Sequence, residues 1–474
     1  MLDVIVQLLT AAGTEINRDM YNDTDGLPTP RRYMAVAALS LGTVLAVMDG
    51  AIANVALPTI ARDLGVESSS VVSIVTIYQL VLVMTLLPLS ALGSRIGLRR
   101  LYRYGQAIFV VAAVLCFFAR SLSFLLAVRA LQALGAAAVL SVSSAMIRSI
   151  YPIGQLGRGM ALNTVMASAG SALAPTLGGL VLSLAPWQWV FATSAPLGVL
   201  SLWLGRASLP TPVVRDEPYD VLGAVLCALS FGLTIFGLEN TVHGGSRVMP
   251  LATIAAGLVV AVIFVRRELR EKSPILPVDL LARPIIALSA IGALIMFIGS
   301  MQLLLSLPFR LQHHYGFTPG QVGAVIAPWP IAIMVVGPIA GILSDRIPAG
   351  ILGGIGTAVA VPALLLLAFL PADATRIDIA WRMALCGMGF ALFMPPNARL
   401  IISSVPVERV ASAGGMTATI RLTGQALGAT VLAMLLAMGV GDGRAPVLVA
   451  ACLAVVAGIC SVSRLRPALR AASA

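Results

Sequence analysis

Long apolar segments separated by short polar loops run along almost the whole chain. A helix needs about 20 apolar residues to cross a hydrocarbon core of about 30 Å. Windows of this kind lie near residues 34–57, 71–92, 104–119, 122–147, 159–184, 188–204, 220–239, 250–266, 284–308, 320–342, 350–370, 380–402, 411–438 and 446–463. The pattern predicts an all-α polytopic membrane protein with fourteen transmembrane helices, so that both termini lie on the same side.

The composition excludes a water-soluble fold. Charged residues make up 11% of the 474-residue chain, whereas about 25% is usual in soluble domains. The net charge of +11 does not indicate a nucleic-acid partner, because the basic residues are scattered between apolar segments and form no stripe. The surroundings that this composition predicts are those of a lipid bilayer.

The basic residues indicate how the chain is oriented. Of the 31 basic residues, 21 fall in the tails and the even-numbered loops and five in the odd-numbered loops. Because Lys and Arg are enriched in cytoplasmic loops, we expect a multi-pass protein of the inner (plasma) membrane with both termini in the cytoplasm. We expect no cleaved secretory signal, since the start of the chain lacks a basic region and its apolar patch is short.

Two linkers divide the predicted helices into six, two and six. Residues 205–219 contain three prolines, and residues 267–283 are basic. We expect a cytoplasmic tail over 1–33, a six-helix bundle over 34–204, a linker with two inserted helices over 205–283, a second six-helix bundle over 284–463 and a cytoplasmic tail over 464–474.

Related patterns occur in the loops after the second and tenth predicted spans. Residues 337–346 read Gly-Pro-Ile-Ala-Gly-Ile-Leu-Ser-Asp-Arg, which resembles the loop signature of the major facilitator superfamily. Residues 90–100 keep the second glycine and the basic run. Glycine permits close helix contact, and an aspartate that faces a helix N-terminus and an arginine can hold a cytoplasmic gate shut. The resemblance implies two related bundles with gate residues Arg95, Gly97, Arg99, Gly341, Asp345 and Arg346.

Other segments resemble the signatures of the fourteen-helix drug:proton antiporters within this superfamily. Residues 47–58 are similar to the first-helix signature, and Arg129 with Gln132 resembles the proton-transfer signature RxxQG, with Ala133 in place of its glycine. The fifth span is close to the antiporter signature GxxxGPxxGG through Gly170, Pro175, Gly178 and Gly179. The resemblance implies a monomer whose partners are protons and a small-molecule substrate.

The fifth span is informative without any family. Gly170, Ala174 and Gly178 recur every four residues, a spacing at which helix backbones can touch. Pro175 removes a helix hydrogen bond beside them. The pattern fits tight packing alone, or packing together with a bend that controls the exchange between inward and outward states.

Three charged residues lie deep within the predicted spans, where a charge costs at least ~2.5 kcal/mol. Asp49 shares a helix face with small residues, and a rise of about 1.5 Å per residue places it at nearly the depth of Arg129. We therefore predict that Asp49 is the proton-coupling carboxylate and Arg129 its partner; the alternative is a structural aspartate. Arg421 shares an inward-facing stripe with Gly414 and Gln425, which fits a substrate or gating role or a hydrogen bond between helices.

Uncharged polar residues within the spans complete the candidate substrate cavity. With Arg421, the candidates are Gln79, Asn163, Gln302 and Asn397. Gln79 and Gln302 could equally form hydrogen bonds between helices. No histidine lies at mid-membrane depth and the spans carry no enzyme or metal-ligand motif, so we expect no enzyme activity, metal or cofactor. The tenth span has no acidic residue, which disfavours dicationic substrates.

These patterns favour a proton-coupled antiporter that exports lipophilic drugs or toxic compounds, including cationic ones, by alternating access. The alternative is a facilitator or symporter of a specific metabolite. The excess of intramembrane arginine over aspartate would suit an anionic metabolite. The signature in the fifth span favours the exporter.

Overall fold

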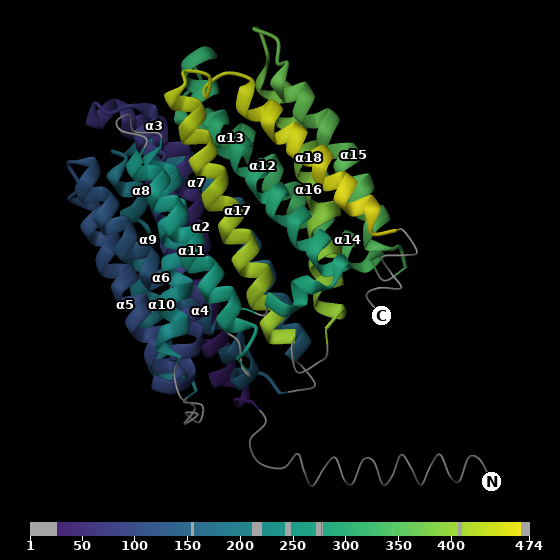
Figure 1. Ribbon diagram of the computed structural model, residues 1–474. Coiled ribbons are helices and arrows are strands. Elements are labelled where there is room, and N and C mark those ends of the chain that lie inside the picture. Colours follow the sequence, from purple (N-terminus) through teal and green to yellow (C-terminus); the bar gives the residue numbers. More distant parts are fainter. Residues whose placement is uncertain are drawn as a thin grey trace.

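The computed structural model describes residues 26–152, 156–210, 220–241, 248–271, 276, 278–344, 346–405 and 410–465. These residues form helices and no strand (Figure 1). The first group of helices comprises α2 (Thr29–Leu64), α3 (Ser68–Val71), α4 (Ser73–Ile96), α5 (Leu98–Phe117), α6 (Leu122–Ile150), α7 (Leu156–Leu184), α8 (Gln188–Ala192) and α9 (Ser194–Ser208).

A second group follows an inserted pair. The pair is α10 (Val221–Asn240) and α11 (Val248–Glu268), and a short 3-10 helix, η2 (Val278–Ala282), leads to the second group. That group comprises α12 (Pro284–His314), α13 (Pro319–Ile326), α14 (Pro328–Leu343), α15 (Ala349–Ala368), α16 (Arg376–Ser403), α17 (Val410–Ala437) and α18 (Ala445–Ser463).

Each apolar window of the sequence coincides with these helices. Thirteen spans in the described part are long and apolar enough to cross a membrane. Some of them consist of two successive helices in line. The remaining window is α7, which carries the shorter apolar helix Ala169–Leu184. The prediction of an all-helical polytopic membrane protein is therefore confirmed.

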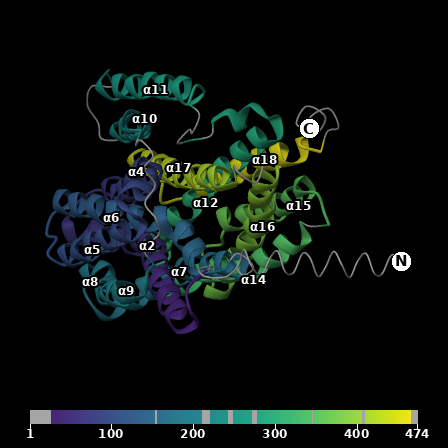
Figure 2. The ribbon, with the colours of Figure 1, turned by 90° about the horizontal axis from the view of Figure 1, so that it is seen from below.

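The helices form two bundles with the inserted pair on one side. In the first bundle α2 packs against α7 and α9, and α6 against α4 and α5. In the second bundle α12 packs against α17 and α18, and α16 against α14 and α15. Figure 2 shows α10 and α11 beside both bundles, where α10 contacts α4 of the first and α17 of the second.

Local sequence signals explain several helix ends. Thr318 and Gln321 form a capping box at the start of α13, and Thr375 and Asp378 form another at the start of α16. A capping box satisfies backbone N–H groups that a helix start otherwise leaves unpaired. After α2, Gly65 has a φ of 63°, a left-handed conformation that costs glycine little.

The two bundles contact each other through α4 and α17, and their backbones approach most closely at one end of the molecule. We call this the upper end, where α2 finishes and α13 begins, and the opposite one the lower end (Figure 1). At the upper end Arg62 of α2 donates to Oε1 of Gln312 in α12 at 3.2 Å. A Cβ atom added to Gly323 of α13 would lie 2.4 Å from the carbonyl oxygen of Pro175 in α7. The backbones of α7 and α13 therefore meet without side chains between them.

The lower end has more space between its helices. No atom lies within 4 Å of the position that a Cβ would take at Gly341 near the end of α14, or at Gly414 near the start of α17. The close helix contact expected at Gly341 is therefore wrong for this conformation. The bundles still meet near this end through α4 and α17, where a Cβ at Gly415 would lie 3.3 Å from Leu87, but no atom of the described residues lies within contact distance of a Cβ at Gly341 or Gly414.

Candidate functional site: a buried ion pair in the first bundle

Asp49 and Arg129 form an ion pair inside the first bundle. Asp49 lies on α2 and Arg129 on α6, and Nη1 of the arginine bonds to Oδ2 of the aspartate. The pairing expected from the depth of the two residues is thus present. Their side chains are 1% and 0% exposed, so neither group contacts solvent in this conformation.

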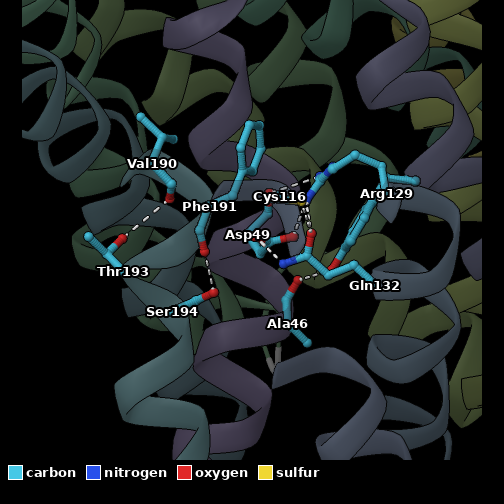
Figure 3. A network of polar contacts seen from close by, with 10 residues as sticks. Ala46, Asp49, Cys116, Arg129, Gln132, Val190, Phe191, Thr193 and Ser194 are labelled. Carbon is cyan, nitrogen blue, oxygen red and sulfur yellow. Dashed lines mark hydrogen bonds and ion pairs between the residues drawn. The ribbon is translucent and has the colours of Figure 1, made fainter. Parts of the chain in front are cut away.

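Gln132 joins the two charges (Figure 3). Its Nε2 donates to Oδ1 of Asp49 at 3.0 Å, and its Oε1 accepts from Nη1 of Arg129 at 2.7 Å. Nη2 of Arg129 also donates to the backbone oxygen of Asp49 at 3.3 Å. Both carboxylate oxygens therefore have donors, and the guanidinium has two neutral acceptors besides the carboxylate.

Aromatic rings enclose the guanidinium. Cζ of Arg129 lies 4.3 Å from the ring centroid of Tyr78 in α4 and 4.8 Å from that of Phe191 in α8. The ring faces attract a cation and exclude water from it. The hydroxyl of Tyr78 donates to the backbone oxygen of Ala46 at 2.8 Å, which fixes the ring one turn before Asp49. The site is thus dry and built from helices that lie far apart in the sequence.

The chemistry of this site follows from the cost of separating its charges. Breaking a buried ion pair by neutralising one partner leaves the other charge uncompensated, at a cost of about 3–5 kcal/mol. Protonation of Asp49 would leave Arg129 with only the oxygens of Gln132 and the Asp49 backbone as acceptors. A proton can therefore bind favourably only if the helices move or another anion or water reaches the arginine.

Sequence reasoning identified the pair and, through the resemblance to the signature RxxQG, Gln132, but not the aromatic residues around them. Gln132 has a detectable signal, because it lies three residues after Arg129 and thus on the same helix face. Tyr78 and Phe191 carry no such signal, since their contacts depend on how α4 and α8 rotate toward α6.

The glycines of residues 170–179 lie on two faces of α7. A Cβ at Gly170 would be 2.8 Å from the backbone oxygen of Val44, and one at Gly178 would be 3.1 Å from that of Ile52. These glycines therefore hold α7 close to α2. On the other face, a Cβ at Gly179 would be 2.8 Å from the backbone oxygen of Pro319. The same short segment thus packs its own bundle and contacts the second one.

Two of the residues expected in a substrate cavity form hydrogen bonds within the second bundle. Gln302 is buried and donates to the backbone oxygen of Gly428 at 2.7 Å, which is the alternative role considered for it. Asn397 is buried and donates to the backbone oxygen of Ser289 at 2.9 Å. Both amides thus join helices within the second bundle.

The other two uncharged candidates lie in the first bundle. Gln79 on α4 is buried and Asn163 on α7 is half-buried. In the described part of the chain, the side-chain oxygens of both lack a hydrogen-bond partner. Arg421, the charged candidate, lies half-buried on α17 of the second bundle.

The candidate gate residues that the structure describes lie at the lower end. Gly97 has a φ of 96° and separates α4 from α5, and Arg99 donates to the backbone oxygen of Arg206 at the end of α9. Arg95 and Arg346 are exposed. Asp345 lies outside the described residues. The first loop is therefore tied to its own bundle through Arg99.

Comparison with known proteins gives the family. The model of the major facilitator superfamily matches residues 39–429. The uncharacterized transporter YebQ of Escherichia coli is 42% identical, over 93% of this chain and 97% of that protein. The riboflavin transporter RibZ of Clostridioides difficile is 26% identical over 84% and 87% of the two chains, and the methyl viologen resistance protein SmvA of Salmonella typhimurium is 27% identical over 86% and 83%.

Solved structures show the same fold. A bacterial homologue of the human lysosomal transporter Spinster, in an inward-facing and unoccupied conformation, superposes with a TM-score of 0.66 over 92% of this chain and 98% of that one, at 16% identity. With its helical bundles and the family match over most of its length, the chain belongs to the major facilitator superfamily and is a transport protein rather than an enzyme.

Proposed function

We propose that this transporter is a proton-coupled antiporter that exports lipophilic compounds by alternating access. The observation that carries the proposal is the buried Asp49–Arg129 pair, which Gln132 joins. A proton-driven carrier needs a carboxylate whose protonation changes the balance between two conformations. Asp49 meets this requirement because its charge is compensated by a residue of another helix.

The moving bodies in this proposal are the bundles over 34–204 and 284–463. In the conformation described here, Gly179 and Pro175 of α7 contact α13 at the upper end. The coupling step is protonation of Asp49, which weakens its hold on Arg129 and allows α2 and α6 to shift against each other. Since α7 packs on α2 through Gly170 and Gly178, such a shift is transmitted to the contact between α7 and α13.

The lower end faces the cytoplasm in our proposal, and the protein acts as a monomer in the inner membrane. The excess of basic residues in the tails and even-numbered loops supports this orientation. The gate at this end consists of Arg95, Gly97, Arg99, Gly341, Asp345 and Arg346. The orientation is tested with Thr241→Cys at the upper end and Glu271→Cys at the lower end, in a background without the native cysteines. An impermeant maleimide should label intact cells at position 241 and not at 271.

The names of the relatives support export of toxic compounds without identifying the substrate. Proteins with similar sequences are named for resistance to methyl viologen and for multidrug resistance. Another relative is named a riboflavin transporter, which keeps a facilitator or symporter of one metabolite as the second candidate.

A drug panel in an efflux-deficient host tests the proposal. Expression of the wild type should raise the tolerated concentration of some lipophilic compounds, and an uncoupler should abolish the effect. Asp49→Asn should insert normally but lose uphill transport. Arg129→Lys should keep part of the uphill transport, because lysine preserves the positive charge but not the planar, two-pronged donor geometry of the guanidinium. Asp378→Asn, at the exposed start of α16, is the matched control and should behave as the wild type. Resistance that survives the uncoupler, or uphill transport by Asp49→Asn, would rule out this coupling site.

A further inference from the structure

Arg421 differs from the other arginines within the spans in having no acceptor among the described residues. It lies near the middle of α17 and is half-buried. Arg129 is paired with Asp49, and Arg310 donates to the backbone oxygens of Leu367 and Ala368 at 2.7 and 3.0 Å. Arg464 donates to Ser289 Oγ at 2.7 Å. The guanidinium of Arg421 is therefore the unsatisfied cation of the described membrane interior.

The neighbours of Arg421 on α17 define the direction in which it lies. One face of α17 packs on α12, because a Cβ at Gly424 would be 2.8 Å from the backbone oxygen of Leu294. Another face packs on α4, where Ala426 clusters with Leu80. Arg421 shares the face between these two with Gly414, two turns earlier, whose surroundings are empty to 4 Å. Gly428, two turns later on the same face, packs on α12, where an added Cβ would lie 2.8 Å from the backbone oxygen of Ile298. The face of Arg421 is therefore open toward the lower end and covered toward the upper end.

The acidic residues of the two bundles do not balance this charge. Inside the helices of the two bundles they are Asp49, Asp63 and Asp378, whereas Glu67, Asp373 and Asp442 lie in the connections between helices and Glu239 lies near the end of α10 in the inserted pair. Asp49 is neutralised by Arg129. Asp63 lies at the upper end of α2, where it accepts from Nε1 of Trp187 at 2.6 Å, and Asp378 belongs to the capping box of α16. Within the described helices of the two bundles, the charge without a partner at mid-depth is therefore positive.

From this imbalance we propose that Arg421 binds an acidic group of the substrate, and that the exported compounds are lipophilic organic anions such as carboxylates and sulfonates. This inference rests on the proposed export function and narrows its substrate class. A planar guanidinium matches the geometry of two acidic oxygens and binds them by paired, charge-assisted hydrogen bonds. A cation would meet like charge at Arg421, with the carboxylate of Asp49 already occupied by Arg129.

Two probes that differ in one charged group test the inference. Binding of 1-anilinonaphthalene-8-sulfonate and of its neutral parent, N-phenyl-1-naphthylamine, is measured by fluorescence on the purified protein in phosphatidylcholine nanodiscs, with empty nanodiscs subtracted. We expect the wild type to bind the sulfonate about tenfold more tightly than the amine, the gain typical of one charge-assisted pair. Arg421→Gln should remove this preference, and Arg421→Lys should keep part of it.

The matched control is Arg399→Gln. Arg399 lies near the lower end of α16 and donates to Oγ of Ser344 at 2.9 Å, so its loss should leave the preference unchanged. Equal binding of the two probes by the wild type, absence of sulfonate binding, or an unchanged preference in Arg421→Gln would overturn the inference. Because no gradient is applied, proton coupling does not affect the result. Sulfonate preference in a protein that shows no proton-driven efflux would refute the proposed function and support the assignment of Arg421.

Discussion

The side-chain amide of Gln132 donates to Oδ1 of Asp49 at 3.0 Å, while its oxygen accepts from Arg129 at 2.7 Å. A single neutral side chain thus holds both members of the ion pair. Since the amide can keep its bond to either partner, it provides an acceptor for the arginine when the carboxylate becomes protonated. Gln132 is a positioning residue for the proposed coupling site.

The first prediction concerns this amide. Gln132→Leu removes one hydrogen bond from each charged group, and hydrogen bonds to charges are worth about 1.5–3 kcal/mol. Proton-driven transport in proteoliposomes should fall about tenfold or more, with unchanged amounts of inserted protein. Gln302→Leu is the control, because Gln302 is equally buried but bonds to the backbone of Gly428. A typical hydrogen bond between membrane helices contributes about 0.6 kcal/mol. Proton-driven transport by Gln302→Leu should therefore fall by no more than about threefold. Equal losses of transport in the two leucine variants would show that Gln132 acts only in packing.

The second prediction concerns the contact between the bundles at the upper end. A Cβ at Gly323 would lie 2.4 Å from the oxygen of Pro175, whereas a Cβ at Gly320 meets its nearest atom at 3.6 Å, an ordinary contact. Gly323→Ala should therefore destabilise the closed upper end by about 1–3 kcal/mol, and Gly320→Ala should not.

Cysteine labelling measures this effect. Val55 of α2 is 1% exposed and packs in a cluster whose other buried residues all belong to the second bundle. With Val55→Cys in place, Gly323→Ala should raise the rate of labelling from the upper side about tenfold, as a shift of about 1.4 kcal/mol implies. Equal rates in the alanine variants of positions 320 and 323 would show that the backbones of α7 and α13 do not form the closing contact.

The third prediction concerns the lower end of the inserted pair. Asp220, which precedes α10, bonds to Nη1 of Arg267 at 2.6 Å and to the backbone N–H of Gly223 at 2.9 Å. Partial burial raises the pKa of Asp220, but the bonds from Arg267 and Gly223 and the charge of Arg267 outweigh it, so the pKa lies below its ordinary value of 3.8. A lowered pKa contributes stability above the ordinary value, and this contribution is lost as the pH falls through the lowered one.

Thermal unfolding across pH tests this pair. Asp220→Asn should be less stable than the wild type by about 0.5 kcal/mol at pH 7, as is usual for a partly exposed ion pair. The difference should begin to shrink as the pH falls below about 4 and should disappear at lower pH. A difference that persists in strong acid would mean that the amide disturbs the helix cap rather than the charge pair.

The fourth prediction follows from the binding of an anion at Arg421 and of one proton at Asp49. Export of an anion in exchange for an entering proton moves net positive charge into the cell. A membrane potential that is negative inside favours this movement by about 2.3 kcal/mol for each charge and each 100 mV. Exchange of a monocation for one proton would move no net charge. Transport of 1-anilinonaphthalene-8-sulfonate by proteoliposomes should therefore respond to a potassium potential set with valinomycin, even without a pH gradient. Transport that follows only the pH gradient would argue against an anionic substrate.

The positions of the spans could be read from the sequence because hydropathy is a local property. A segment such as residues 350–370 must become a helix in a bilayer, where its backbone can bond only to itself. The match in depth of Asp49 and Arg129 was likewise accessible, since the helical rise is fixed and the loops set the direction of each span. The sequence by itself therefore determined the helices, the order in which they cross the membrane and the pairing of the two buried charges.

The tertiary structure decided which polar side chains are satisfied. Gln302, Asn397 and Arg421 look alike in sequence, as polar residues within apolar helices. Packing turned the two amides toward neighbouring helices, where they bond to Gly428 and Ser289, and left the arginine without an acceptor among the described residues. The physical reason is that helical periodicity defines a face, but the partner of that face depends on how each helix rotates and tilts within its bundle.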